Sequence, residues 1–424
     1  MSTELLSSAV VGEGSPESDL TREALASIVR QGLETVAPGE RVLAIVPDKT
    51  RDDNTDLLFP VADELLTRRQ VACFDVLIAQ GTHPPMLEPQ KLAKLGLTKF
   101  SGNLFDHRWD RPDDLIVLGE LDASLVSRLT NGLISDSVPV SVNKLLAPGK
   151  YDTVLIFGAT VPHEVAGFAG GAKYFFPGVA GPELTHMTHW LGALAGIENV
   201  IGRVETPTRH LIEAAAALVQ ARIISLNTVV SRDASNRLIT HALFAGDVRE
   251  AFRLAADVSK QVHIRYTGRQ YKRVVAILDP HYDEMWVGGK ASYKLGAIIE
   301  DDGELIIYAP HLTKLSETHG ALIEKYGYAP LESVRDMLGA SPELRENLCI
   351  AAHLAHVSYA GRIDERGKVA PRYQITMATG LDEATCRRVN LSYLDHHTFN
   401  CESYRAAPNI LIVENAGRDL YKIN

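Results

Sequence analysis

The sequence predicts an α/β protein with mainly parallel sheets, divided into two domains. Short apolar runs rich in β-branched residues recur along the chain, and such runs are typical of strands buried on both faces of a parallel sheet. Segments with apolar residues at helical spacing lie between these runs, so strand and helix alternate. The 424 residues exceed the roughly 150 of a typical domain, which favours two or three domains.

The expected strands and helices follow these two patterns in chain order. The expected strands are Arg41–Val46, Val71–Ala79, Asp114–Leu118, Thr153–Phe157, Ile223–Val230, Arg273–Leu278, Glu304–Tyr308 and Asn409–Val413. The expected helices are Asp56–Gln70, Thr206–Arg222, Asp247–Lys260, Ser292–Ile299 and Leu331–Leu338. Thr206 precedes a proline and Asp247 follows a glycine, so each is placed to cap the start of its helix.

Domain boundaries are predicted from polar segments. Residues 1–19 are rich in Ser, Glu and Gly, which predicts a loose N-terminal arm. The polar segment 262–272 separates a long helix from a new strand, so we expect an N-terminal domain over 20–268 and a C-terminal domain over 269–404. The last strand could return to the first domain, in which case 405–424 would rejoin it.

Composition and charge exclude several classes of protein. Apolar residues are 46% and charged residues 23%, which is average for globular proteins, and no apolar run is long enough to span a membrane. The net charge of −10 disfavours a nucleic-acid partner. The first 19 residues contain no Lys or Arg, so a secretion signal is not expected. Four cysteines without a CxxC pair indicate reduced thiols in a cytoplasmic protein rather than a zinc ribbon.

A glycine-rich segment, residues 161–190, follows the strand Thr153–Phe157 and contains Lys173. Five glycines in 15 residues favour a backbone that wraps closely around a ligand; these are Gly167, Gly170, Gly171, Gly178 and Gly181. Ala172 before the lysine and Tyr174 after it do not fit a phosphate-binding P-loop, and the segment does not match HExxH. The alternative is a purely structural connection with a surface lysine.

Three histidines flank this segment: His163, His186 and His189. His186 and His189 are three residues apart and would share one face of a helix, so together they could bind a metal ion. The alternative is that one of them only packs or caps.

Two further clusters follow predicted strands. Residues 46–56, VPDKTRDDNTD, contain Asp48, Thr50 and Arg51, which could position an anion or a ribose. An ordinary turn with solvated charges is the alternative. Residues 79–86, AQGTHPPM, place His83 after the next strand, where a single histidine is more often structural.

All three clusters follow strands that would lie side by side in a parallel sheet. Because the carboxyl ends of such strands meet at one edge, we expect His83, His163, Arg51 and Lys173 to converge.

Together these segments resemble the lactate racemase family, which uses a nickel-pincer nucleotide. The matching motifs occur in the family's order: DKTR from Asp48 to Arg51, GTHPPM around His83, PHEVAGFAGGAKYFFPG with His163 and Lys173, and KASYKLGA from Lys290. His189 follows the lysine by 16 residues, as in the family. The resemblance runs over roughly residues 20–415, and the block HEVAGFAGGAK is specific to the family.

The resemblance implies a fold and a site. The fold would be two α/β domains with the active site in the cleft between them. Lys173 would hold the cofactor covalently, a pyridinium-3-thioamide-5-thiocarboxylate mononucleotide that binds nickel as a pincer, and His189 would complete the nickel coordination. Asp48, Thr50, Gly167, Gly170 and Gly171 are expected to help bind the cofactor.

The resemblance also implies an activity, the racemisation or epimerisation of a 2-hydroxy acid by hydride transfer. His83 and His163 would be the two acid/bases, because the substrate hydroxyl lies on opposite sides in the two enantiomers. Arg51 and Lys290 would bind the substrate carboxylate. The expected partners are a small 2-hydroxy acid and the proteins that synthesise the cofactor, with no nucleic acid and no membrane; a homo-oligomer is possible.

Two positions depart from the family pattern. Pro84 replaces an arginine after the GTH histidine, and Val287 replaces a glutamine three residues before Lys290. The substrate could therefore be lactate, malate or another 2-hydroxy acid. Two other classes stay open: an NAD-type 2-hydroxy acid dehydrogenase, disfavoured because no GxGxxG fingerprint occurs, and a non-catalytic nickel or nucleotide carrier.

Overall fold

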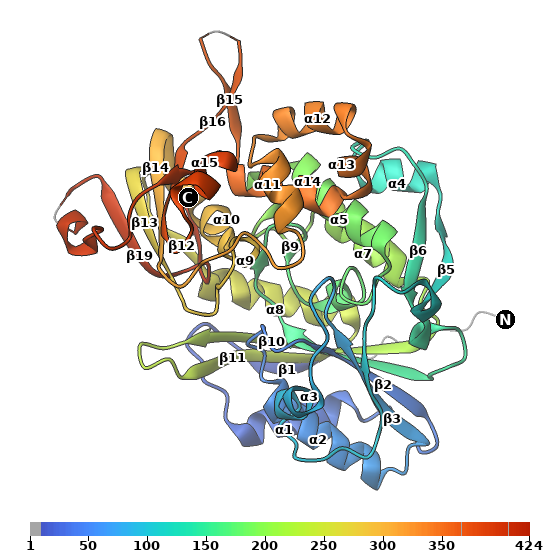
Figure 1. Ribbon diagram of the computed structural model, residues 1–424. Helices are drawn as coiled ribbons and strands as arrows, with labels where there is room; N and C mark the ends of the chain where they lie inside the picture. The colour runs from blue at the N-terminus through green and yellow to red at the C-terminus, as the bar shows by residue number, and fades with distance from the viewer. Residues whose placement is uncertain (1–9, 366, 406) are drawn as a thin grey trace. The chain divides into compact units, whose positions relative to one another are not determined.

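The computed structural model describes residues 10–365, 367–405 and 407–424 (Figure 1). The described chain forms two compact units. Unit 1 comprises the chain up to Thr188 together with Arg203–Val262, and unit 2 comprises His189–Gly202 and His263–Asn424. Both are α/β units with mainly parallel central sheets, as the sequence predicts.

Among the described residues of unit 1, seven strands form the central sheet. Their order across it is β1 (Val11–Gly14), β11 (Leu238–Gly246), β10 (Arg222–Arg232), β7 (Thr153–Ala159), β2 (Arg41–Pro47), β3 (Cys73–Ala79) and β4 (Leu104–Asp106). The run from β10 to β4 is parallel, and only β11 is antiparallel to its neighbours. All residues of β7 are buried, as expected for a central parallel strand.

Helices cover both faces of this sheet (Figure 1). On one face α1 (Arg22–Gly32) and α2 (Thr55–Arg68) bury Val29, Leu58 and Phe59 against β2, β3 and β7. On the other face α8 (Val248–His263) packs its apolar side on β10 and β11. The remaining helices of unit 1 are α3 (Glu88–Lys94), α4 (Ala123–Leu129), α7 (Pro207–Ala216) and the first half of α5 (Pro182–Ala195).

The predicted helix caps are confirmed. The Thr206 side chain accepts the N–H of Arg209 at 3.0 Å at the start of α7. The Asp247 carboxylate accepts the N–H groups of Arg249 and Glu250, both at 3.0 Å, at the start of α8. Each side chain thus satisfies backbone donors that have no partner within the helix.

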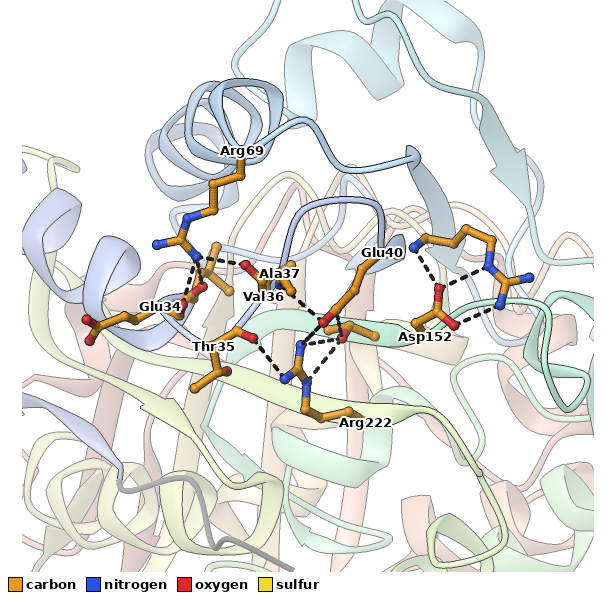
Figure 2. A network of polar contacts seen from close by, with 11 residues as sticks. Glu34, Thr35, Val36, Ala37, Glu40, Arg69, Asp152 and Arg222 are labelled. Atoms are coloured by element: carbon orange, nitrogen blue, oxygen red, sulfur yellow. Dashed lines mark hydrogen bonds and ion pairs between the residues drawn. The ribbon is translucent and has the colours of Figure 1, made fainter.

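A polar network ties together the amino ends of the parallel strands in unit 1 (Figure 2). Arg222 at the start of β10 donates to Glu40 at 2.7 Å and to the carbonyl of Thr35 at 2.9 Å. Asp152, just before β7, accepts from the Arg41 guanidinium at 2.7 Å. These charged groups lie at the amino ends of the strands, whereas the predicted site residues follow the carboxyl ends. The network therefore joins neighbouring strands and is separate from the predicted site.

Unit 2 is built on a parallel sheet of five strands within its described residues. The order across the sheet is β18 (Ser392–Tyr393), β17 (Gln374–Thr379), β14 (Ile299–Ala309), β13 (Tyr271–Leu278) and β19 (Ile410–Ala416). A separate parallel pair joins β12 (Ile264–Tyr266) to β20 (Leu420–Lys422). The hairpin of β15 (Gly361–Ile363) and β16 (Val369–Pro371) projects from this unit (Figure 1).

The helices of unit 2 enclose one large apolar core. In chain order they are α6 (Ile197–Val200), α9 (Met285–Gly288), α10 (Lys290–Leu295), α11 (Gly320–Tyr326), α12 (Leu331–Ala340), α13 (Pro342–Glu346), α14 (Leu348–Ser358) and α15 (Glu383–Arg388). Every residue of α14 after Leu348 is buried. Residues 189–202 are the first chain segment of unit 2, and they contribute Ala193, Ile197 and Ile201 to this core.

Four expectations need correction. The arm predicted over 1–19 is not loose at residues 11–14, which form β1 and pair with β11; residues 1–9 lie outside the described residues. The C-terminal strand does not rejoin the first domain, because β19 pairs with β13 in unit 2. Residues 189–202 belong to unit 2 rather than to the N-terminal domain, since their apolar side chains lie in its core.

The fourth correction concerns the run predicted as a strand over 114–118. It forms β5 (Leu115–Leu121), which pairs antiparallel with β6 (Val138–Asn143) outside the central sheet. Its exposed Val117 shows that the run is not buried on both faces.

No helix of the described chain has the length and apolar character needed to cross a membrane.

Candidate functional site

The predicted site residues of unit 1 lie where its strand order reverses. From β2 the chain proceeds outward on one side to β3 and β4, and on the other side to β7 and β10. Loops that leave the carboxyl ends of β2 and β7 therefore diverge, and in open α/β sheets ligands bind in the crevice at such a point. The loop after β2 carries Asp48 and Arg51, the loop after β3 carries His83, and the loop after β7 carries His163 and Lys173.

Asp48 and His83 form a hydrogen-bonded pair. Asp48 Oδ2 lies 2.7 Å from His83 Nδ1, and Asp48 Oδ1 accepts the backbone N–H of Thr50 at 2.8 Å. Burial opposes ionisation, but the His83 hydrogen bond, together with the charges of His83 and Arg51, holds the pKa of Asp48 well below its usual range. Asp48 is therefore an anion that accepts Nδ1–H of His83 and leaves Nε2 directed away from the pair as a proton acceptor.

The Asp48 carboxylate is thus engaged within the chain. Its hydrogen bonds to Thr50 and His83 indicate that it orients the histidine ring. The family resemblance implies cofactor binding by Asp48 and does not predict this contact with His83. The rest of this loop is anchored by Lys94, which donates to both oxygens of Asp53 and to the Arg51 carbonyl, each at 2.8 Å.

The glycine-rich loop needs its glycines for close approach. Gly167 has φ +82° and Gly170 has φ +100°, and a Cβ at these positions would meet the Arg203 carbonyl at 1.9 Å and the Thr160 hydroxyl at 2.4 Å. The loop continues into η3 (Gly171–Tyr174), a 3-10 turn that contains Lys173. Gly171 donates its N–H to the buried side chain of Asn227 on β10 at 2.8 Å.

A buried arginine donates hydrogen bonds to backbone carbonyls of the same loop. Arg209 on α7 is 1% exposed and donates to the carbonyls of Gly170 at 3.2 Å and Phe168 at 2.5 Å. Its guanidinium lies 4.0 Å from the centre of the Phe252 ring. Arg209 therefore fixes the backbone immediately before Lys173.

Lys173 is held with an unusually low pKa. Burial, then the positive charges of Arg51 and, more weakly, Arg209, lower the pKa of Lys173 to about 7, against a smaller opposing effect of Glu164. A large fraction of the amine is therefore neutral near pH 7, and a neutral amine is the nucleophilic form.

The Nδ1 atom of His163 is a hydrogen-bond acceptor, whereas the Nδ1 atom of His83 donates to Asp48. In His163, Nδ1 accepts the backbone N–H of Val165 at 3.1 Å, so the neutral ring carries its proton on Nε2. The Glu164 carboxylate lies 3.7 Å from the same Nδ1, too far for a hydrogen bond.

In unit 2, Lys290 also lies at a reversal of strand order. From β13 the chain continues to β14 on one side, while β19 pairs with the other side. Lys290 begins α10, and its Nζ lies 5.4 Å from the centre of the ring of Tyr282, which follows β13. Gly417, which follows β19, approaches both Tyr282 and Lys290.

His186 and His189 lie on the same helix, α5, as predicted, but belong to different units. His186 packs edge-on against Trp109 of unit 1, with ring centres 6.1 Å apart. In unit 2, burial, followed by the charges of His356, His319 and His189, lowers the pKa of His353 well below its ordinary value. His189 is therefore close to a buried histidine cluster, and the two α5 histidines have separate surroundings.

The structure thus links four of the predicted residues of unit 1, Asp48, Arg51, His83 and Lys173, whereas the contacts given above for His163 are with its neighbours Glu164 and Val165. The Arg51 charge acts on both Asp48 and Lys173, and Asp48 contacts His83. Residues 189 and 290 belong to unit 2. Sequence reasoning missed Arg209 and Asn227; a lone arginine on the otherwise apolar face of α7 was the available signal for the first.

Charged loops at the reversal point of a parallel sheet are typical of ligand-binding α/β units, and a partly buried lysine in one of these loops suits covalent attachment of a ligand. Comparison with known proteins gives the family. Residues 2–200 match the family model of the lactate racemase N-terminal domain. A lactate racemase from Thermoanaerobacterium thermosaccharolyticum is 25% identical over 238 residues, which are 55% of this chain and 52% of that protein.

Two solved structures extend the likeness to nearly the whole chain. A crystal structure of a Thermotoga maritima protein is 32% identical with a TM-score of 0.86, covering 96% of this chain and 99% of that one. The lactate racemase apoprotein from T. thermosaccharolyticum has a TM-score of 0.71 at 17% identity, covering 97% of this chain and 99% of that one. Residues 2–200 of the chain therefore match the lactate racemase family, and the described chain has the fold of the lactate racemase apoprotein over nearly its whole length. Its sequence match to the curated racemase spans about half the length of that protein.

Proposed function

We propose that this protein is an isomerase that inverts C2 of a 2-hydroxy acid with a nickel-pincer nucleotide attached to Lys173. The observation that carries the proposal is the state of Lys173. It is a lysine with a pKa of about 7 in a glycine-rich loop, at the same sheet edge as the Asp48–His83 pair. The match of residues 2–200 to the lactate racemase family, which by resemblance uses a nickel cofactor, supports the same assignment.

The residues of unit 1 fit such a cofactor. A neutral amine is needed to form a covalent bond to an acyl or thioacyl carbon, and Lys173 supplies one near neutral pH. The hydroxyl of Thr160, beside Gly170, is buried and has no hydrogen-bond partner among the described residues, so it can accept one from a ligand. By family resemblance, His189 would bind the nickel.

When bound, the cofactor would accept hydride from C2 of the substrate and return it to either face. The chain's own residues handle the proton. His83, oriented by Asp48, would take the hydroxyl proton at Nε2, while His163 in its doubly protonated form would donate a proton from Nε2 to the substrate oxygen in the opposite orientation and be left neutral. In the reverse direction His163 would accept at Nε2 and carry its other proton on Nδ1, the atom that faces Glu164.

The substrate carboxylate would be bound by Arg51 and Lys290. A guanidinium can donate two parallel hydrogen bonds to a carboxylate, which fixes the plane of the acid. Pro84 is exposed and Val287 is partly buried beside the core of unit 2, and neither offers the polar group that the family usually has there. We propose that the substrate is a 2-hydroxy acid, with lactate and malate as the first candidates.

An isotopic experiment tests the reaction class. Protein produced in a host that makes the cofactor would be incubated with C2-deuterated lactate or malate, and the enantiomer formed would be analysed by mass spectrometry. The product should keep the deuterium, because hydride transfer never exposes it to water. Unlabelled substrate in heavy water should gain no C2 deuterium. Exchange of C2 with solvent would instead show direct proton abstraction and would overturn the mechanism.

A second measurement tests the site of attachment. The intact mass of the loaded protein should exceed the mass of the chain, and the peptide that contains Lys173 should carry the difference. Lys173→Ala should lose both the added mass and the racemisation. An adduct that persists in this variant would reject Lys173 as the attachment site.

A further inference from the structure

A group of three metal-binding side chains lies in unit 2 within one short loop. Among the described residues, Asp395, His396 and His397 are the group of three whose candidate ligand atoms all lie within 4.8 Å of one another. The loop follows β18 and leads into η5 (Cys401–Tyr404). None of these residues was singled out by the motifs of the racemase site, and none lies in those motifs.

Two imidazoles and a carboxylate are a ligand set for a first-row transition metal. Imidazole nitrogen suits Zn²⁺, Cu²⁺, Ni²⁺ and Co²⁺, whereas Mg²⁺ and Ca²⁺ prefer oxygen ligands alone. Bonds of about 2.0–2.2 Å to nitrogen and oxygen require ligand atoms about 3–4 Å apart, so small side-chain rotations would bring the three atoms to a common ion. The two imidazole rings already lie side by side, with centres 4.0 Å apart.

A separate observation points to a ligand at this position. The Nδ1 atom of His396 is buried, and no hydrogen-bond partner for it occurs in the described part of the chain. A buried polar nitrogen without a partner costs free energy, and such atoms are rare in folded proteins. A metal ion bound at this nitrogen would supply the missing partner.

The loop that carries the group is anchored at both ends. Leu394 donates its N–H to the Met377 carbonyl at 2.9 Å, and the Phe399 ring packs on Tyr308 with centres 5.3 Å apart. Between these anchors the Asp395 side chain accepts the N–H of His397 at 3.0 Å. Little conformational freedom would therefore be lost when an ion binds.

We propose that Asp395, His396 and His397 form a binding site for one divalent transition-metal ion. The site is separate from Lys173 and the other motif residues, and the proposal does not depend on the function proposed above. Three protein ligands leave at least one coordination position for water or another small ligand.

Titration calorimetry with ZnCl₂ tests the proposal. The full chain would be produced without a histidine tag, in a host that lacks the cofactor pathway, and treated with a chelator and dialysed. It should bind one Zn²⁺ at this site. Because loss of an outer partner of a metal ligand already costs about 10–100-fold in affinity, His396→Ala and His397→Ala should each weaken this binding by at least about tenfold. Asp395→Asn keeps the acceptor for the His397 N–H and should weaken binding as well.

Two controls make the result specific. His210→Ala removes a partly exposed histidine that pairs with the Glu205 carboxylate at 2.9 Å, and should leave Zn²⁺ binding unchanged. His189→Ala should also retain the ion. Circular dichroism and thermal melting would verify that every variant is folded. Unchanged Zn²⁺ affinity in His396→Ala and His397→Ala, or loss of the ion only in His189→Ala, would overturn the proposal.

Discussion

Lys173 shows how a local environment can prepare a residue for covalent chemistry. A surface lysine has a pKa near 10.4, so only about one amine in 2,500 is neutral at pH 7. Burial and the Arg51 charge lower the pKa of Lys173 to about 7. We therefore expect its reactivity toward an acylating reagent in the cofactor-free protein to rise with pH through a midpoint near 7. The measurement is quantitative mass spectrometry of the Lys173 peptide after brief labelling at pH 6–10.

Lys150, an exposed lysine of unit 1 in the turn before β7, provides the internal reference for this titration. Its labelling should keep rising to higher pH. Arg51→Gln should move the midpoint for Lys173 upward, because a neighbouring positive charge that disfavours the protonated amine is removed. A Lys173 midpoint equal to that of the exposed lysine would contradict the burial argument.

Asp48 is predicted to act through His83. Asp48→Asn would offer an amide in place of the carboxylate, so the ring could hold its proton on Nε2 and lose its basic atom there. General acid–base catalysis by a positioned side chain contributes about 10²–10⁴-fold to the rate. We expect a fall in that range with a much smaller change in KM, measured on protein with its cofactor content determined.

Thr50→Val serves as the comparison, since Thr50 contacts the same carboxylate without touching His83. It should reduce kcat far less than Asp48→Asn. Equal losses in the two variants would mean that the loop as a whole, and not the histidine tautomer, had been disturbed.

The sequence could reveal these residues but not their pairing. His83, Arg51 and Lys173 follow apolar runs that are recognisable as strands, so their place at one sheet edge could be predicted. Asp48 and His83 are 35 positions apart, and no spacing rule encodes the direction of either side chain. The pKa of Lys173 depends on burial, which arises only when loops from separate strands pack together.

At the level of elements, α7 holds the glycine-rich loop in place through the hydrogen bonds of Arg209. Arg209→Met would remove the donors to the carbonyls of Phe168 and Gly170 while keeping a long side chain against Phe252. A buried carbonyl left without a donor costs about 1–3 kcal/mol, so we expect a lower free energy of unfolding in urea. The loosened loop should also admit water to Lys173, which would raise the midpoint of its labelling.

Arg249→Met is the matched control for Arg209→Met. Arg249 lies on α8, is largely exposed and pairs with Glu213 at 2.9 Å, and exposed ion pairs contribute only about 0–1 kcal/mol. It should change neither the labelling midpoint nor, by much, the unfolding free energy. If both substitutions behaved alike, Arg209 would have no special part in holding the loop.

Elements were predictable where one pattern dominated. The runs that became β2, β7 and β13 are almost wholly apolar and were recognised. β11 was missed because Thr240 and His241 interrupt its apolar residues, although both are buried in the structure. β5 has the same composition as a buried strand, yet it pairs only with β6 outside the central sheet, and no pattern within β5 itself encodes that pairing.

At the scale of the whole molecule, the chain crosses between the two units three times, after Thr188, Gly202 and Val262. A sequence boundary near 262–272 captures only the last crossing. The first two arise because a short segment of the N-terminal half completes the core of the C-terminal unit. No polar linker marks the first crossing, since α5 continues through it.

This exchange predicts that unit 2 is incomplete as a simple C-terminal fragment. Ala193, Ile197 and Ile201 are only 3%, 3% and 2% exposed in its core, and burying an isoleucine stabilises by about 1.5–3 kcal/mol. A fragment of residues 263–424 should therefore unfold at a lower urea concentration than the same fragment with residues 189–202 joined through a flexible linker. The transition would be followed by circular dichroism and by binding of an apolar dye. A third fragment, in which the joined segment carries Ile197→Asp and Ile201→Asp, should lose the gain because charged side chains cannot enter the apolar core. Equal midpoints for all three fragments would show that residues 189–202 add nothing to the stability of unit 2. These residues would then lie near the core of unit 2 without contributing to its folding.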